Sequence, residues 1–64
     1  MFQLGKSVVA TRDLQAGNEI TEEDVVAKVS EPPGLPAQMQ TEVIGRTLLV
    51  DVARDRPLQH DHLL

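Results

Sequence analysis

The 64-residue sequence has no cysteine, no tryptophan, no tyrosine and only one phenylalanine. The absence of cysteine excludes a disulfide scaffold, a thiolate metal site and a catalytic thiol. With aromatic residues at 2%, the core has to be built from small aliphatic side chains. A chain of this length forms one small domain, which buries only about 60% of its unfolded surface. We therefore expect a binding or accessory module rather than a complete enzyme with its own substrate pocket.

Positive charge is also scarce, since six Lys and Arg residues face ten Asp and Glu residues and give a formal net charge of −4. The sequence has no basic patch with interleaved aromatic residues, which argues against a nucleic-acid partner. No apolar run approaches the ~20 residues that a membrane span needs. The first six residues lack the apolar region of a secretory signal. We expect no contact with a membrane and a cytoplasmic location.

The first half of the chain predicts two short strands around a turn and a helical turn. Lys6–Ala10 is a short apolar run that is typical of a strand. Gly17-Asn18 is a turn dipeptide, because both residues tolerate positive φ. Thr21–Asp24 combines an N-cap residue with an acid three positions later and predicts a short helical turn. The β-branched stretch Val25–Val29 predicts a strand with its three odd-numbered residues, Val25, Ala27 and Val29, on one face.

The second half begins with a segment that cannot be regular structure, because Glu31–Pro36 contains three prolines. A short helix is expected from Pro36 to about Val43, and Gly45 is well placed to end it. Leu48–Val52 alternates as a strand does, and His60–Leu64 predicts a last turn or a frayed end. The predicted core consists of aliphatic residues from both halves: Val8, Val9, Ile20, Val25, Leu48, Val50, Val52 and Leu58.

The chain also repeats a pattern. Residues 14–25 can be aligned with residues 52–63 so that apolar positions coincide, with Leu14 on Val52 and Ile20 on Leu58. Both stretches predict a strand, a turn, one apolar anchor and a helical turn. This suggests two similar half-units about a pseudo-two-fold axis, with a chance recurrence of short apolar patterns as the alternative.

Several stretches then follow in a characteristic order. They are Ser7–Ala10, Asp13–Gly17, Ile20–Val25, Lys28-Val29, Pro33–Pro36 (Pro-Gly-Leu-Pro) and Val43–Arg46 (Val-Ile-Gly-Arg). In this order and spacing the sequence resembles the antifreeze-like (SAF) domain, which forms the C-terminus of sialic acid synthases and is related to fish type III antifreeze proteins. The resemblance covers about Leu4 to Leu63, within a single domain of residues 1–64.

The resemblance implies a mostly β, irregular fold of the pretzel or β-clip type, with short strands, 3₁₀ turns and internal pseudo-two-fold symmetry. It also implies a parent enzyme that condenses phosphoenolpyruvate with N-acetylmannosamine or its 6-phosphate in a metal-dependent (β/α)₈ barrel. In the family's homodimer, the antifreeze-like domain reaches over the partner's active site. This sequence contains no barrel, so the resemblance assigns it no catalytic residue, no metal ligand and no cofactor. The divalent metal is expected in the parent barrel.

The resemblance places one loop over the partner's active site, and it follows Lys28. The loop consists of Val29, Ser30, Glu31, Pro32, Pro33, Gly34, Leu35 and Pro36. Many bacterial synthases carry Lys-Arg-Pro-Gly here, and the Arg reaches the sugar substrate. Lys28 matches the Lys, but Val29 stands about where the Arg would be. Lys28 is thus the candidate neighbour of a sugar or phosphate, with a solvated strand residue as the alternative. The family also implies a cis peptide bond at Glu31-Pro32.

Ice binding is the rival function that the resemblance raises. The positions of the ice-binding face carry Arg12, Gly17, Asn18, Glu19, Thr21, Glu22, Glu23 and Asp24. Only Thr21 keeps the family's residue, and charged side chains hold water in geometries unlike an ice lattice. The sequence therefore disfavours a stand-alone antifreeze protein. A third possibility, a SAF module of a pilus or flagellar chaperone, would be expected to carry a secretion signal or extra domains.

Two polar pairs remain. His60 and His62 could form a metal pair on a strand, but with no third ligand in fixed geometry we expect mobile C-terminal histidines. Asp13 and Asp51 could form a carboxylate pair for acid–base chemistry, but nothing in the sequence indicates a cleft between them. We expect both to have turn or surface roles.

Overall fold

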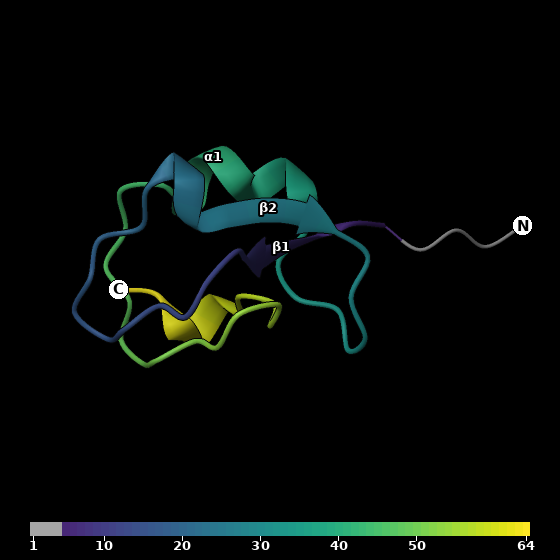
Figure 1. The fold of residues 1–64 in the computed structure, drawn as a ribbon. Helices are drawn as coiled ribbons and strands as arrows, with labels where there is room; N and C mark the ends of the chain where they lie inside the picture. The colour runs from purple at the N-terminus through teal and green to yellow at the C-terminus, as the bar shows by residue number, and fades with distance from the viewer. Residues whose placement is uncertain (1–4) are drawn as a thin grey trace, which may run out of the picture.

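The computed structural model describes residues 5–64, and its only regular sheet within that range is a short antiparallel pair (Figure 1). Strands β1 (Ser7–Ala10) and β2 (Val25–Lys28) pair with Ser7 opposite Lys28 and Ala10 opposite Val25. Helix α1 (Gln40–Val43) lies on one side of this pair, and the C-terminal turn lies on the other. Three 3₁₀ turns complete the elements: η1 (Glu22–Asp24), η2 (Ala37–Met39) and η3 (His60–His62).

Strand β1 is the centre of the fold. All four of its residues are buried, whereas β2 exposes Val26 and Lys28. The reason is that β1 has neighbours on both edges: β2 on one, and isolated bridges from Ser7 to Pro36 and from Val9 to Pro57 on the other. The β-branched pair Val8-Val9 suits this position, because it packs well on both faces of a pleated strand.

The core is aliphatic, as the shortage of aromatic residues predicted. Its buried members come from every part of the described chain: Val8, Ala10, Leu14, Ile20, Val25, Leu35, Val43, Leu48, Val52 and Leu58. Most of the chain between them is loop. Even so, no buried side-chain nitrogen or oxygen within residues 5–64 lacks a hydrogen-bond partner. The polar side chains that enter the core of the described residues are therefore paired.

Two expectations about strands were wrong. Leu48–Val52 is not a strand, and Val50 is 43% exposed rather than part of the core. Leu48 bridges Leu63 while Val52 bridges Leu14, so the chain turns from one partner to another and breaks the alternation between them. Val29 was expected within the second strand, on the same face as Val25 and Ala27, but β2 ends at Lys28 and Val29 is 56% exposed.

The other local expectations are confirmed. The Lys6–Ala10 run contains β1, Thr21 precedes η1, and η2 with α1 forms the helix expected after Pro36. The Glu31–Pro32 peptide bond is cis. Leu4, where the resemblance begins, lies outside the described residues. Within residues 5–64, no helix has the length and apolar character that crossing a membrane requires.

Backbone hydrogen bonds repeat between the 14–25 segment and the 52–63 segment. Leu14 and Val52 pair with each other, donating N–H to O across 2.7 and 2.8 Å. The Asn18 N–H donates to the Gln15 carbonyl at 3.1 Å, and the Arg56 N–H donates to the Ala53 carbonyl at 3.1 Å. Each of these bonds in one segment thus has a counterpart at the aligned position of the other.

The bridges to the rest of the chain repeat in the same way. Glu19 bridges Thr47, and the aligned Pro57 bridges Val9. Leu63 bridges Leu48, and the aligned Val25 pairs with Ala10. The two segments therefore make the same pattern of bridges and backbone hydrogen bonds. A pseudo-two-fold axis that relates the two segments stays a prediction.

Candidate functional site

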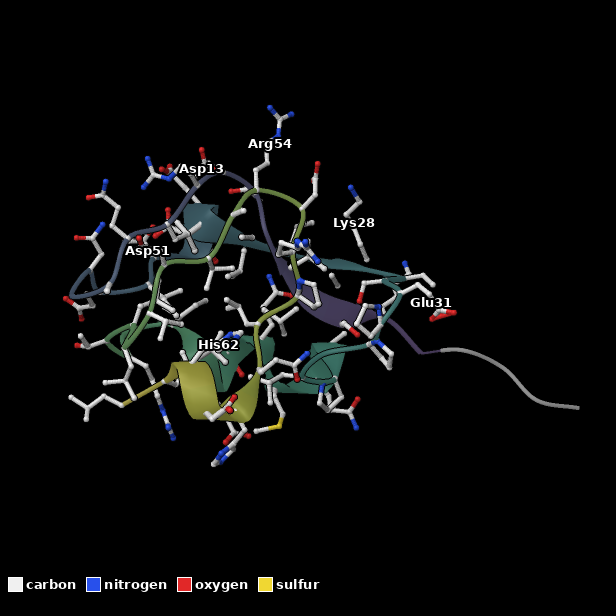
Figure 2. All side chains as sticks on the ribbon, turned by 90° about the horizontal axis from the view of Figure 1, so that it is seen from below. Asp13, Lys28, Glu31, Asp51, Arg54 and His62 are labelled. Carbon is white, nitrogen blue, oxygen red and sulfur yellow. The ribbon has the colours of Figure 1, made fainter. Side chains whose placement is uncertain are left out.

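A hollow of about 330 Å³ lies beside the end of β2, at the lower end of the size range of small-molecule sites. Two segments that are far apart in sequence form it. One supplies Lys28, Val29 and Glu31, and the other supplies Arg54, Asp55 and Arg56. In Figure 2, Lys28 and Arg54 point outward on the same side of the molecule, while Glu31 lies further along the loop.

The second wall of this hollow is a tight turn, Ala53–Arg56. The turn is closed by the Arg56 N–H, and Asp55 within it has a φ of 70°. This left-handed conformation is unfavourable for most residues but tolerated by Asp. The backbone fixes the turn from both sides: Asp55 N–H donates to the Ala10 carbonyl at 2.9 Å, and Arg54 N–H donates to Asp13 Oδ1 at 2.8 Å. The side chains of this turn therefore project from a rigid base.

The charges around the hollow are only loosely paired. Lys28 Nζ lies 3.7 Å from Asp55 Oδ1, and Arg54 Nε lies 4.0 Å from Asp55 Oδ2. All three side chains are more than half exposed. Ion pairs of this length in water contribute little to stability. The cations are therefore available to a ligand that offers a better-placed anion.

The loop that follows Lys28 has an exposed part and an anchored part. Val29 and residues 31–33 are exposed, with Ser30 partly covered. Further along, Gly34 N–H donates to Ser7 Oγ at 3.0 Å and Leu35 N–H donates to the Leu58 carbonyl at 2.9 Å. A Cβ on Gly34 would lie 2.5 Å from that carbonyl oxygen, so only glycine fits there. Residues 29–33 thus form a free surface on a fixed support.

Asp13 and Asp51 do not form an acid–base pair. Each carboxylate accepts a backbone hydrogen bond from the turn of the opposite segment: Asp51 Oδ1 from Ala16 N–H and Asp13 Oδ1 from Arg54 N–H, both at 2.8 Å. This confirms the expected turn roles. Asp13 also ties the cation-bearing turn to the rest of the domain.

Asp24, the buried acid of η1, has a clearly shifted pKa. Burial raises the pKa of Asp24, but the hydrogen bond from Thr21 N–H at 2.9 Å and the ion pair with Arg12 outweigh burial. The pKa therefore lies below the ordinary value of 3.8. Arg12 and Thr21 line a separate hollow with Asn18 and Glu19. The positions expected for ice binding are thus charged and indented.

His62 takes the place in η3 that Asp24 takes in η1. Its Nδ1 accepts a hydrogen bond from Gln59 N–H at 3.0 Å, and the expected mobility of the C-terminal histidines stays a prediction. Within residues 5–64, no group of three or more His, Cys, Asp or Glu residues is placed to hold a metal ion. His62 therefore has a structural use, as the acceptor at the start of η3.

Sequence reasoning found Lys28 but missed Arg54 and Arg56. The sequence predicted only a turn at Asp55-Arg56-Pro57. It showed no basic patch, because more than twenty residues of chain separate Lys28 from Arg54 and Arg56. The alignment of the two segments was a usable signal. It places Arg54 and Arg56 opposite the neutral Ala16 and Asn18, which shows that the turn itself does not need arginine.

Comparisons with known proteins give one consistent result. The family model described as "SAF domain" matches residues 5–64. N-acetylneuraminate-9-phosphate synthase of Drosophila melanogaster is 39% identical over 56 residues, or 88% of this chain. The chain spans only 15% of the length of that relative.

A solved structure is similar over nearly the whole fold. It is the solution structure of an antifreeze protein like domain in the human N-acetylneuraminic acid phosphate synthase gene. The TM-score is 0.84 at 30% sequence identity, and the match covers 95% of this chain and 76% of the human one. The mostly irregular arrangement with a two-stranded sheet is thus a known fold.

Proposed function

The chain belongs to the SAF domain family, as an antifreeze-like domain of the kind found in sialic acid synthases, and we propose that it serves such an enzyme as a non-catalytic cap. The cap covers the partner subunit's active site and helps to bind the acceptor sugar, N-acetylmannosamine or its 6-phosphate. The observation that carries this proposal is the free surface of residues 29–33 beside the cation-lined hollow at Lys28.

A cap acts by closure rather than by chemistry of its own. Closing a loop over a barrel mouth excludes water from the condensation and fixes the acceptor against phosphoenolpyruvate. The anchored part of the loop suits this role, because Gly34 and Leu35 hold residues 29–33 on the core. A rigid support positions a contact residue more precisely than a mobile loop does.

The remaining parts of the reaction are assigned to the parent protein. Within this proposal, a (β/α)₈ barrel of the other subunit in a homodimer supplies the catalytic residues, the phosphoenolpyruvate pocket and the divalent metal. The parent acts as a transferase of N-acetylneuraminate biosynthesis in the cytoplasm. Lys28 contacts the sugar or its phosphate. The 64-residue chain alone is expected to have no synthase activity.

Deletion of this domain from the full-length synthase that the proposal implies tests the capping role. Removal of the stretch equivalent to Ser7–Leu64 is expected to lower kcat/KM sharply while the barrel stays folded and dimeric. Normal dimerisation with full activity would show that the domain is no cap. Circular dichroism and sedimentation velocity check the fold and the dimer.

A substitution separates a substrate cap from a passive stability domain. Lys28→Ala is expected to raise the KM for the acceptor more than the KM for phosphoenolpyruvate. Arg46→Ala is the matched control, because it also removes one exposed cation but does not line the hollow. A passive domain would give equal losses for both substrates.

A further inference from the structure

The positive charges of this acidic chain are concentrated at one place. The sequence has six Lys and Arg residues in all, and three of them, Lys28, Arg54 and Arg56, line the hollow beside β2. The other wall residues include only two carboxylates, Asp55 and Glu31. Three cations against two carboxylates give the hollow a formal charge of +1, in a chain with a net charge of −4.

The fold does not require these arginines. The aligned turn, Gln15–Asn18, closes with the same 3.1 Å hydrogen bond and has Ala16 and Asn18 where the Ala53–Arg56 turn has its two arginines. Two arginines placed on a turn that also forms without them indicate a use other than folding.

The arginine turn also differs in its central residue. The Gln15–Asn18 turn has Gly17 with a φ of 91°, which glycine adopts freely, whereas Asp55 has a φ of 70°. Asp55 keeps a carboxylate between Lys28 and Arg54 at 3.7 and 4.0 Å. In the free protein, this exposed carboxylate partly screens the charge of the two cations.

We propose that Lys28, Arg54 and Arg56 form a subsite for the phosphate group of a phosphorylated acceptor sugar. This inference rests on the proposed function, and it specifies which acceptor the domain prefers. Guanidinium groups bind phosphate through two parallel N–H···O bonds, and Lys adds a point charge. A phosphate dianion in the hollow would replace the long contacts that Lys28 and Arg54 make with Asp55 by shorter, charge-assisted hydrogen bonds to phosphate oxygens.

The two arginines add cationic groups to a hollow in which the loop after Lys28 supplies none. Val29 lines the same hollow as Arg54 and Arg56, and its own side chain offers no polar group there. The two arginines therefore bring guanidinium groups to this place from another part of the chain. A polyanion such as a nucleic acid is a poor alternative, because the charge of the chain outside the hollow is strongly negative.

The test is an NMR titration of the 64-residue chain, at low ionic strength, with N-acetylmannosamine 6-phosphate, inorganic phosphate and unphosphorylated N-acetylmannosamine. Both phosphates are expected to saturate with a dissociation constant on the order of 1 mM. The shifts should gather at the amides of residues 28–31 and 53–57. The unphosphorylated sugar should bind at least about tenfold more weakly than its 6-phosphate.

Charge-matched double variants decide whether the site is specific. Arg54→Ala with Arg56→Ala is expected to weaken phosphate binding at least about tenfold, whereas Lys6→Ala with Arg46→Ala, which removes the same charge elsewhere, should leave it within about twofold. Equal losses in both variants, or shifts that do not saturate or that scatter over the surface, would overturn the proposal.

This outcome is distinct from that of the capping test. If the chain fails to bind phosphate but its deletion still abolishes synthase activity, the phosphate subsite is wrong and the cap remains. If the chain binds phosphate but its deletion leaves activity unchanged, the three cations bind phosphate without serving the acceptor of a synthase, and both the cap and the acceptor subsite are wrong.

Discussion

Residues 14–25 carry four carboxylates and no cation, whereas residues 52–63 carry two carboxylates and two arginines. Their backbones nevertheless make corresponding hydrogen bonds, from the mutual pair of Leu14 and Val52 to the helical turns η1 and η3. The comparison teaches that the pairing plan and the aliphatic anchors determine this fold. The exposed side chains are free to differ, and in the second segment they build the hollow.

The largest expected difference between the two segments is in the stability lost when the side chain that caps each helical turn is removed. Asp24→Ala removes a buried carboxylate that accepts from Thr21 N–H and pairs with Arg12. His62→Ala removes only a neutral acceptor from Gln59 N–H. At pH 7 we expect losses of about 1.5–3 kcal/mol for Asp24→Ala and about 1 kcal/mol for His62→Ala, measured by urea unfolding. Equal losses would mean that charge does not distinguish the two turns.

The pH dependence of the same pair sharpens the comparison. Because the pKa of Asp24 is lowered in the folded state, its contribution is complete above the ordinary value of 3.8. The contribution is lost as the pH falls from there through the lower pKa of the folded protein. The difference in unfolding free energy between the parent protein and Asp24→Ala should therefore become smaller as the pH falls below 3.8. A gap that stays constant down to pH 2 would contradict this assignment.

Substitution of Asp13 and Asp51, whose carboxylates each bind the turn of the opposite segment, should cost less stability, and about the same amount for each residue. Asp13→Ala and Asp51→Ala each remove one exposed hydrogen bond to the opposite turn, and each is expected to cost about 1 kcal/mol in urea unfolding. Glu31→Ala, which removes an exposed loop carboxylate, should change stability by less than about 0.5 kcal/mol. A cost confined to one of the two aspartates would show that the segments are not held alike.

The two left-handed turn positions should respond in different ways. Gly17→Ala is expected to cost about 1 kcal/mol, because its φ of 91° strains any side chain although the space around it is open. Asp55→Gly should stay within about 0.5 kcal/mol of the parent, since relief of the φ is offset by the freedom that glycine gains in the unfolded chain. Thermal unfolding measures both, and a large loss for Asp55→Gly would mean that its carboxylate stabilises the fold.

Ice binding is expected to be absent. The face that includes Arg12, Glu19 and Asp24 is charged and hollowed, so it offers no flat, weakly polar surface to ice. Nanolitre osmometry should show no thermal hysteresis beyond that of an inert protein at equal concentration. Faceted crystals at sub-millimolar protein would reverse this conclusion and make the acidic segment the functional one.

Much of the fold could be predicted from local pattern. β1, the turn at Gly17, the cap at Thr21 and the helix after Pro36 each have signals within a few residues. The failures at Val29 and Val50 share a cause, because alternation predicts a buried face only where one partner runs alongside the whole stretch. Val50 lies between two different partners, and Val29 lies beyond the end of β2.

The candidate site was predictable only in part. Lys28 was found because it is part of a recognisable local order of residues. Arg54 and Arg56 were missed because their nearness to Lys28 depends on the bridge from Val9 to Pro57, which joins distant parts of the chain. No short pattern contains that information. Alignment of the two segments shows which side chains depart from the common plan, but not where they meet.

The crossed bonds of Asp13 and Asp51 have a consequence for how fast the chain folds. Their partners lie 41 and 35 residues away, so neither turn can be completed by its own half while the other half is still unfolded. Closing such long loops loses chain entropy before any contact compensates for it. We expect this chain to fold in one cooperative step, and more slowly than a helical bundle of equal length.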